Sequence, residues 1–268
     1  MSTQPRASRL NLLDGPEWLL FTRTWFVHNP DARTDKILHP ATFPESLAQR
    51  FIEFFTKPGD WIIDPFLGSG SSLIASKRAH RNALGIELYP LYANFAESAL
   101  SRIPGENKTL VVQGDTRQEL KKLQLSGSPK FSFCITSPPY WSQLHSNSER
   151  HHQRKTKGLR TLYGDDSRDL GNIEDYEHFL QEQEKIFTDL HSLMKDRAYL
   201  VLITNNVYKN GRLYPLAFDT LNTLSKKWVP KDEKIWCQDY RKLRPFGMFH
   251  SYIGNRAHHY CLVFRKEN

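Results

Sequence analysis

Short apolar runs alternate along the chain with longer stretches in which large apolar residues recur at helical spacing. Each run is bounded by glycine, proline or polar residues, as buried strands usually are. Leu47, Phe51 and Phe55 recur every four residues and predict a helix packed against a sheet, and residues 173–194 predict a longer amphipathic helix. The runs that predict strands are 61–63, 83–87, 110–112, 131–135 and 199–203. Strands that alternate with helices in this way predict an α/β fold.

A glycine turn follows the first of these runs. It consists of Asp64, Pro65, Phe66, Leu67, Gly68, Ser69 and Gly70. Glycine permits positive φ and a close approach of the backbone to a ligand, and the N–H groups of the helix that follows favour an anionic or carboxylate group. The next run ends at Glu87, so the order strand, glycine turn, helix, strand, acid is that of a nucleoside-binding α/β half. Glu87 can there accept hydrogen bonds from both ribose hydroxyls.

Two other nucleotide-binding patterns are missing from this turn. The third glycine position of the dinucleotide fingerprint is occupied by Leu73, and the triphosphate-binding pattern with its lysine is absent. The third apolar run leads to Gly114 and Asp115. In a fold of this kind Asp115 would lie near the purine edge of a bound nucleoside, and an ordinary turn residue is the alternative.

The segment Ser137-Pro138-Pro139-Tyr140 directly follows the strand-like run 131–135. Each proline fixes φ and removes an N–H donor, which leaves a rigid row of carbonyl acceptors beside a hydroxyl and an aromatic face. These groups predict a slot for a flat heterocycle that carries an exocyclic amine. A proline-rich linker or ligand is the alternative for so short a motif.

Composition adds size and charge to this picture. The chain has 268 residues, enough for one large α/β domain or two small ones. Its net charge of +8 fits a polyanionic partner, and equally a basic protein without one. Cys134, Cys237 and Cys261 show no zinc-binding spacing, so we predict no metal site and a reducing, cytoplasmic location. No apolar run is long enough to span a membrane.

Two basic segments are candidates for contacts with phosphates. Residues 142–172 are polar and charged, and arginines and lysines gather between 150 and 160. We expect a lid that contacts a nucleic-acid backbone, with a solvated loop as the alternative. Residues 236–259 interleave basic and aromatic side chains, which is typical of nucleic-acid-binding surfaces. A β-hairpin with one solvent-exposed face is the alternative.

The glycine turn and the Ser-Pro-Pro-Tyr motif together resemble those of the DNA methyltransferases that use S-adenosylmethionine to methylate the amino groups of bases. Further motifs of that family resemble residues 39–45, 85–87, 193–203 and 258–264. The resemblance implies a Rossmann-like, doubly wound and mostly parallel sheet of the class I methyltransferase type. We therefore expect one catalytic domain over 1–268, with the loop 142–172 inside it and without a large target-recognition domain. Compared with many family members, the two central motifs stand in a circularly permuted order.

The same resemblance implies the reaction. Serine in the first motif position is most typical of enzymes that methylate the exocyclic N4 of a cytosine flipped out of DNA. Ser137 and the Pro138 carbonyl would then accept hydrogen bonds from the target amine, and Tyr140 would stack on the base. An N6-adenine DNA methyltransferase, an RNA base methyltransferase and a non-catalytic nucleic-acid-binding relative are the alternatives. The chain has no Pro-Cys dipeptide, which argues against covalent chemistry at cytosine C5.

The resemblance also assigns residues and partners. The catalytic set is Ser137, Pro138, Pro139 and Tyr140. The set expected to bind S-adenosylmethionine is Asp64, Pro65, Phe66, Gly68, Ser69, Gly70, Glu87 and Asp115. DNA is the expected partner, with phosphate contacts from 150–160 and 236–259. A place in a restriction-modification system and a possible homodimer are family expectations.

Overall fold

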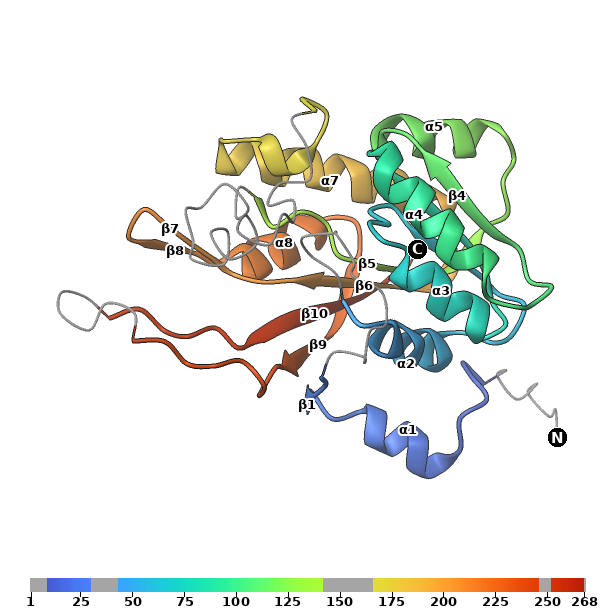
Figure 1. Cartoon of the computed structure of the whole chain (residues 1–268), viewed down its shortest axis with the longest axis horizontal. Coiled ribbons are helices and arrows are strands. Elements are labelled where there is room, and N and C mark those ends of the chain that lie inside the picture. The colour runs from blue at the N-terminus through green and yellow to red at the C-terminus, as the bar shows by residue number, and fades with distance from the viewer. Residues whose placement is uncertain (1–8, 30–42, 142–165, 246–251, 268) are drawn as a thin grey trace, which may run out of the picture.

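An eight-stranded sheet forms the centre of the computed structural model, which describes residues 9–29, 43–141, 166–245 and 252–267 (Figure 1). The strand order is β1-β9-β10-β6-β5-β2-β3-β4, and β10 alone runs antiparallel to its neighbours. The strands are β1 (Trp25–Val27), β2 (Trp61–Asp64), β3 (Asn82–Glu87), β4 (Thr109–Gln113), β5 (Phe131–Thr136), β6 (Met194–Thr204), β9 (Val229–Cys237) and β10 (His258–Arg265). The predicted α/β fold with a doubly wound, mostly parallel sheet is confirmed.

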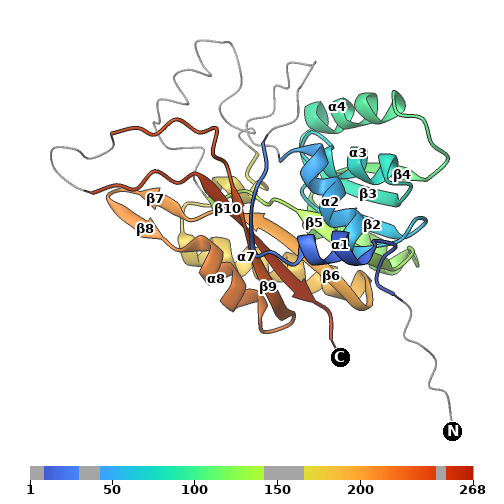
Figure 2. The same cartoon turned by 90° about the horizontal axis from the view of Figure 1, so that it is seen from below.

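Helices cover both faces of this sheet (Figures 1 and 2). One face carries α1 (Gly15–Phe21), α2 (Glu45–Phe55), α3 (Ser71–Arg78) and α4 (Pro90–Ser101). The other carries α5 (Thr116–Leu125), α7 (Tyr176–Leu193) and α8 (Leu216–Leu224), with the short 3₁₀ helix η2 (Leu170–Asn172) before α7. Among the described residues, none of these helices has the length and apolar character needed to cross a lipid bilayer.

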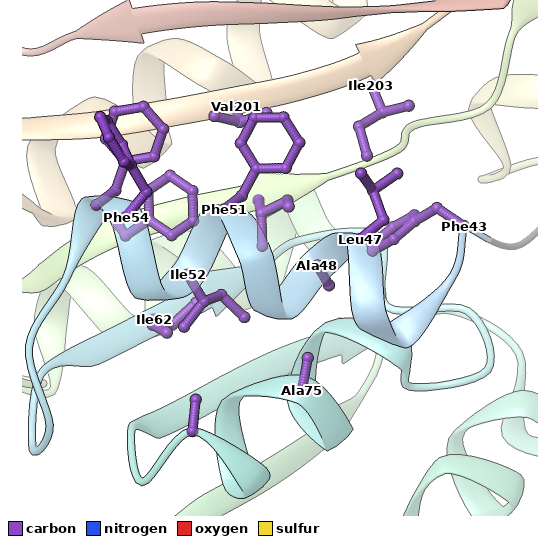
Figure 3. Close-up of a cluster of buried hydrophobic side chains, with 14 of the residues drawn as sticks. Phe43, Leu47, Ala48, Phe51, Ile52, Phe54, Ile62, Ala75, Val201 and Ile203 are labelled. Atoms are coloured by element: carbon purple, nitrogen blue, oxygen red, sulfur yellow. The ribbon is translucent and has the colours of Figure 1, made fainter. Parts of the chain in front are cut away.

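The apolar stripe of α2 lies where its spacing predicts. In Figure 3, Leu47 and Phe51 point toward Ile203 and Val201 of β6, and Ala48 faces Ala75 of α3. Successive residues of a strand face opposite sides of a sheet. Ile62 of β2 accordingly joins the α2 side of the core, whereas the next residue joins the α7 side. The core therefore fixes which way every central strand faces.

The sequence before α2 includes Thr42, which has the spacing of a capping box with Glu45 and would place Pro44 in the first turn. Thr42 lies outside the described residues, Pro44 is the N-cap rather than a first-turn residue, and no side chain caps this helix. A complete capping box occurs instead at α1, between Asp14 and Glu17. It orients α1 so that Phe21 packs on the core, while Trp18 and Leu19 stay exposed.

The direction of chain growth reverses beside β2. From β2 the chain proceeds outward through β3 to β4, and then returns through α5 to place β5 on the other side of β2. Loops after two such strands diverge to opposite faces and leave a crevice at the carboxyl edge of the sheet. The glycine turn follows β2 and the Ser-Pro-Pro-Tyr motif follows β5, so both begin at this crevice.

A small hairpin, β7 (Val207–Lys209) and β8 (Arg212–Tyr214), lies apart from the main sheet. It follows the paired residues Asn205 and Asn206 at the end of β6. The Asn206 carboxamide oxygen accepts a hydrogen bond from the Ala217 N–H at the start of α8. Asn206 therefore stabilises this helix end.

Substituting Gly70 tests how tightly the turn is packed. Gly70 has a φ of +92°, and a methyl group added there would lie 2.9 Å from the Ala96 Cβ of α4. We expect Gly70→Ala to lower the free energy of unfolding by about 2–3 kcal/mol, because backbone strain and overpacking add. Gly59→Ala, with a φ of +83° and open space around it, isolates the strain, expected at about 1 kcal/mol. Urea denaturation measures both, and equal losses would contradict the packing of the turn on α4.

Candidate functional site

One cavity, open to solvent, lies at the carboxyl edge where β2, β3 and β5 end. Its walls come from the glycine turn, the end of β3, the start of α5, the Ser-Pro-Pro segment and the segment before α7. The lining residues are Phe43, Pro65, Phe66, Leu67, Gly68, Ser69, Ser71, Ile86, Glu87, Leu88, Tyr89, Asp115, Thr116, Arg117, Ser137, Pro139, Arg168, Asp169, Leu170 and Ile186. The two motifs that the sequence singled out therefore share one cavity.

The glycine turn exposes backbone to this cavity. Gly68 and Gly70 both have positive φ, +56° and +92°, which glycine adopts without strain. Gly70 is the N-cap of α3 and has no side chain to cap it, so N–H groups at the helix start are left for another acceptor. Gly68 and Ser69 line the cavity, whereas Gly70 lies behind them against Ala96.

Glu87 at the end of β3 joins the turn to the opposite wall. One carboxylate oxygen accepts from the Gly68 N–H at 2.8 Å, and the other accepts from the Tyr89 N–H at 2.9 Å. Burial raises the pKa of Glu87 to about 7, although these two hydrogen bonds act against the rise. A ligand hydroxyl that donates to Glu87 would favour its charged form further.

Asp64 is buried beneath the cavity rather than in its wall. Its carboxylate accepts from the hydroxyls of Ser72 on α3 and Thr136 on β5, and from the Phe66 N–H. Burial raises the pKa of Asp64 to about 6, with the same hydrogen bonds opposing the rise. Asp64 is not among the residues that line the cavity, so its contacts position the two motifs.

Asp115 caps a helix and also lines the cavity. Its side chain accepts from the Arg117 N–H at 3.0 Å and caps α5, as a turn residue would. It also lines the cavity and holds the Arg117 guanidinium at 2.9 Å. Arg117 in turn contacts Glu182 of α7 and the Arg168 carbonyl, so a network of charges closes this end of the cavity.

Sequence reasoning missed part of the wall opposite the glycine turn. Asp169 is buried, accepts from the Tyr89 hydroxyl at 2.8 Å and caps η2 through the Gly171 N–H. Tyr89 and Asp169 are eighty positions apart in the sequence. The Asp-x-Gly pattern of a cap was the available signal, but nothing in it indicates the partner on the other side of the cavity.

The Ser-Pro-Pro-Tyr segment is divided by the structure. Ser137 and Pro139 line the cavity, whereas Pro138 is buried and Tyr140 lies outside the lining set. The Tyr140 hydroxyl is 3.1 Å from the Ser137 hydroxyl. Trp141, with a φ of +49°, follows and packs between Tyr176 of α7 and Tyr214 of β8.

Several predicted contacts cannot be placed. Residues 142–165, which include the basic cluster 150–160, lie outside the described residues, as do 246–251 within the segment 236–259. In the ranges that are described, no group of three or more histidine, cysteine, aspartate or glutamate side chains could hold a metal ion.

Comparison with known proteins finds partial matches to DNA methylases. A family model described as DNA methylase, of the N6/N4 type, matches residues 15–98, which include the glycine turn and Glu87. The Type II methyltransferase M.BglII of Bacillus subtilis is 28% identical over 132 residues, and M.Cfr9I of Citrobacter freundii is 40% identical over 73 residues. These matches make residues 15–98 similar to the N6/N4 DNA methylase family. The match with M.BglII covers 48% of this chain and 35% of M.BglII. The match with M.Cfr9I covers 27% of this chain and 23% of M.Cfr9I. The chain therefore spans about a third or less of the length of these relatives.

Solved structures share the fold of this chain. NSun6 from Pyrococcus horikoshii aligns with a TM-score of 0.54 at 13% identity, over 89% of this chain and 57% of that one. A putative rRNA-methylase from Clostridium thermocellum aligns with a TM-score of 0.51 at 10% identity, over 82% and 96%. Identities this low show only a shared fold, and that fold is the expected class I methyltransferase type. The permuted motif order and the single domain over 1–268 stay predictions.

The pKa of Glu87 makes a pH-dependent contribution to stability. Because the folded value, about 7, lies above the ordinary 4.5, the folded state holds an extra proton between these pH values. The free energy of unfolding should therefore fall as pH rises from 4.5 to 7, by an amount on the order of 3 kcal/mol from this residue. Glu87→Gln should flatten that slope in urea denaturation at a series of pH values. An unchanged slope in the variant would place the titration elsewhere.

Proposed function

We propose that this protein transfers a methyl group from S-adenosylmethionine to the exocyclic N4 of a cytosine in DNA. The observation that carries the proposal is the single cavity lined by Gly68, Ser69 and Glu87 on one side and by Ser137 and Pro139 on the other. A methyl donor and a base amine held on these two sides would meet inside it. The Ser-Pro-Pro-Tyr form of the motif supports cytosine over adenine.

The donor side of the cavity fits a nucleoside with an amino-acid substituent. Phe66, Leu88 and Ile186 supply apolar surface for a purine, Glu87 and Asp115 can accept from hydroxyl or amino groups, and the glycine turn gives backbone room. When bound, S-adenosylmethionine supplies an electrophilic methyl group on a sulfonium. Residues of the donor side contribute by binding and orienting it toward the Ser137 wall.

On the acceptor side, the target amine needs to be oriented because its lone pair is delocalised into the base ring. Carbonyl acceptors of the diproline segment can hold the amine hydrogens and leave the lone pair directed at the methyl group. Stacking on Tyr140 would keep the base plane fixed. No covalent enzyme intermediate is needed, and the amine loses its proton after transfer.

A basic face beside the acceptor side fits duplex DNA. The β7–β8 hairpin carries Lys209 and Arg212, and the segments that extend β9 and β10 project on the same side of the molecule (Figures 1 and 2). Arg256 on one of these segments lies over the Tyr208 ring of the hairpin at 5.7 Å. Lys242, Arg244 and exposed Leu243 and Tyr252 belong to the same segments. Cations interleaved with apolar side chains suit phosphates and an unpaired strand.

The relatives are named Type II methyltransferases, and we extend the proposal to a place in a restriction-modification system.

Transfer of radiolabelled methyl from S-adenosylmethionine to plasmid DNA tests the proposal. We expect label in DNA, and nucleoside digestion with mass analysis should identify N4-methylcytosine. N6-methyladenine as the product would keep the reaction class and correct the base. Label in RNA but not in DNA would overturn the proposed substrate, and no transfer to either would overturn the activity.

Point variants should separate the two sides of the cavity. Glu87→Ala should weaken S-adenosylmethionine binding ten- to a hundredfold, because hydrogen bonds to a charged group are lost. Tyr140→Ala should retain cofactor affinity in calorimetry while methyl transfer falls below detection, and Pro138→Ala should behave likewise. Glu97→Ala, at an exposed acid on α4, is the matched control for loss of a carboxylate. Weakened cofactor binding by Tyr140→Ala would contradict this division.

A further inference from the structure

A row of four polar side chains connects the antiparallel strand β10 and the segment after β9 to the cavity. Arg241 Nη2 lies 3.5 Å from His259 Nε2, and His259 Nδ1 lies 3.2 Å from the Tyr140 hydroxyl. The Tyr140 hydroxyl lies 3.1 Å from the Ser137 hydroxyl, which belongs to a residue that lines the cavity. His259 is on β10 and Ser137 follows β5. The row therefore joins two residues that are 122 positions apart in the sequence.

Arg241, the first residue of the row, determines which group donates and which accepts in each of the hydrogen bonds that follow. A guanidinium group has only hydrogen-bond donors, so the His259 Nε2 that faces Arg241 is the acceptor. A neutral imidazole with Nε2 as acceptor carries its hydrogen on Nδ1. Nδ1–H then donates to the Tyr140 oxygen, and the Tyr140 hydroxyl hydrogen is left to donate to the Ser137 oxygen.

The surroundings hold these groups in place. The His259 ring stacks on Trp236 of β9, with ring centroids 4.9 Å apart and planes at 27°. The Arg241 N–H donates to the Gln238 carbonyl, which fixes the backbone beside the guanidinium. Burial raises the pKa of the Tyr140 hydroxyl well above its usual range, so this hydroxyl keeps its proton and stays a donor.

We propose that Arg241 and His259 are positioning residues that, through Tyr140, make the Ser137 hydroxyl a hydrogen-bond donor to a ring nitrogen of the target base. A serine oxygen that already accepts from Tyr140 has its own hydrogen free for such a bond. The proposal rests on the proposed function and deepens it.

The consequence is a rule for which bases fit. Cytosine N4 is next to the acceptor N3, and adenine N6 is next to the acceptor N1. A hydroxyl donor beside carbonyl acceptors is complementary to such an amine-and-acceptor edge. Thymine and uracil have no exocyclic amine and present carbonyls next to a ring N–H, so they meet the slot with the wrong polarity. Ser137 would therefore recognise the ring nitrogen, and carbonyl acceptors of the diproline segment would hold the amine. This changes the role first expected of Ser137, which was to accept from the amine.

The tautomer of His259 can be tested without any methyl transfer. Nitrogen-15 NMR of the labelled full chain distinguishes Nδ1–H from Nε2–H imidazole, and His259→Asn identifies the signal by its loss. We expect the Nδ1–H form. The Nε2–H form would overturn the proposal, whatever the activity of the protein.

Kinetics of variants test whether the row acts as a unit. We expect His259→Leu and Tyr140→Phe each to lower kcat about tenfold with little change in KM for DNA, the effect of one lost hydrogen bond. The double variant should be no worse than either single variant, because both break the same row. His259→Asn keeps an N–H near the Nδ1 position and should recover most of the activity. Tyr260 lies next to His259 on β10, and its hydroxyl is hydrogen-bonded to Asn206. The control variant Tyr260→Phe, which removes this hydroxyl, should leave kcat unchanged. Additive losses or no rescue would overturn the proposal.

A base analogue tests the last step. In an oligonucleotide duplex, the methylated base is replaced by 3-deazacytosine, or by 1-deazaadenine where adenine is the product. The wild-type chain should methylate the analogue about tenfold more slowly than the natural base, and Ser137→Ala should no longer distinguish the two. Equal rates by the wild-type chain would overturn the proposal. A chain with the Nδ1–H tautomer that transfers no methyl to any DNA would instead refute the proposed function.

Discussion

The hydrogen bond from the Thr136 hydroxyl to the buried Asp64 carboxylate, 2.6 Å long, joins the ends of β2 and β5. Asp64 directly precedes the glycine turn and Thr136 directly precedes Ser137, so this contact fixes the separation of the two halves of the cavity. Ser72 on α3 donates to the same carboxylate and ties in the helix that follows the turn. A buried carboxylate that accepts three hydrogen bonds costs less to desolvate than an unpartnered one, because its oxygens keep donors.

The cavity is assembled from segments that each have a second task. Glu87 ends β3 and holds the Gly68 and Tyr89 N–H groups, and Asp115 caps α5 while it binds Arg117. Asp169 caps η2 and receives the Tyr89 hydroxyl. These acids therefore make the walls rigid before any ligand arrives, which reduces the entropy lost on binding. Their accumulation in one crevice of a chain with a net charge of +8 sets this side of the cavity apart from the basic face that we propose for DNA.

The Ser-Pro-Pro-Tyr segment also contacts elements outside the cavity. Trp141 is buried between α7 and the β7–β8 hairpin, and Lys209 of that hairpin lies over its ring at 4.4 Å. Movement of the β7–β8 hairpin on contact with a nucleic acid would therefore displace Trp141, which directly follows the Ser-Pro-Pro-Tyr segment. Tyr140 provides a second connection, through His259, to the segments that extend β9 and β10.

Local pattern alone determined the central strands, the helix stripe of Leu47 and Phe51, the glycine turn and the diproline segment, because strand burial, helix period and restricted φ are properties of neighbouring residues. It also fixed the acid at the end of β3, since position relative to a strand end is a local fact. Only the tertiary structure decided that Tyr89 meets Asp169, that His259 meets Tyr140, and that Asp64 lies beneath the cavity rather than in it. These contacts join residues brought together by the order in which strands enter the sheet, and that order is set by packing over the whole core. The short strands β1, β7 and β8 were likewise unpredicted, because strands of three residues carry too little periodicity to be recognised without their partners.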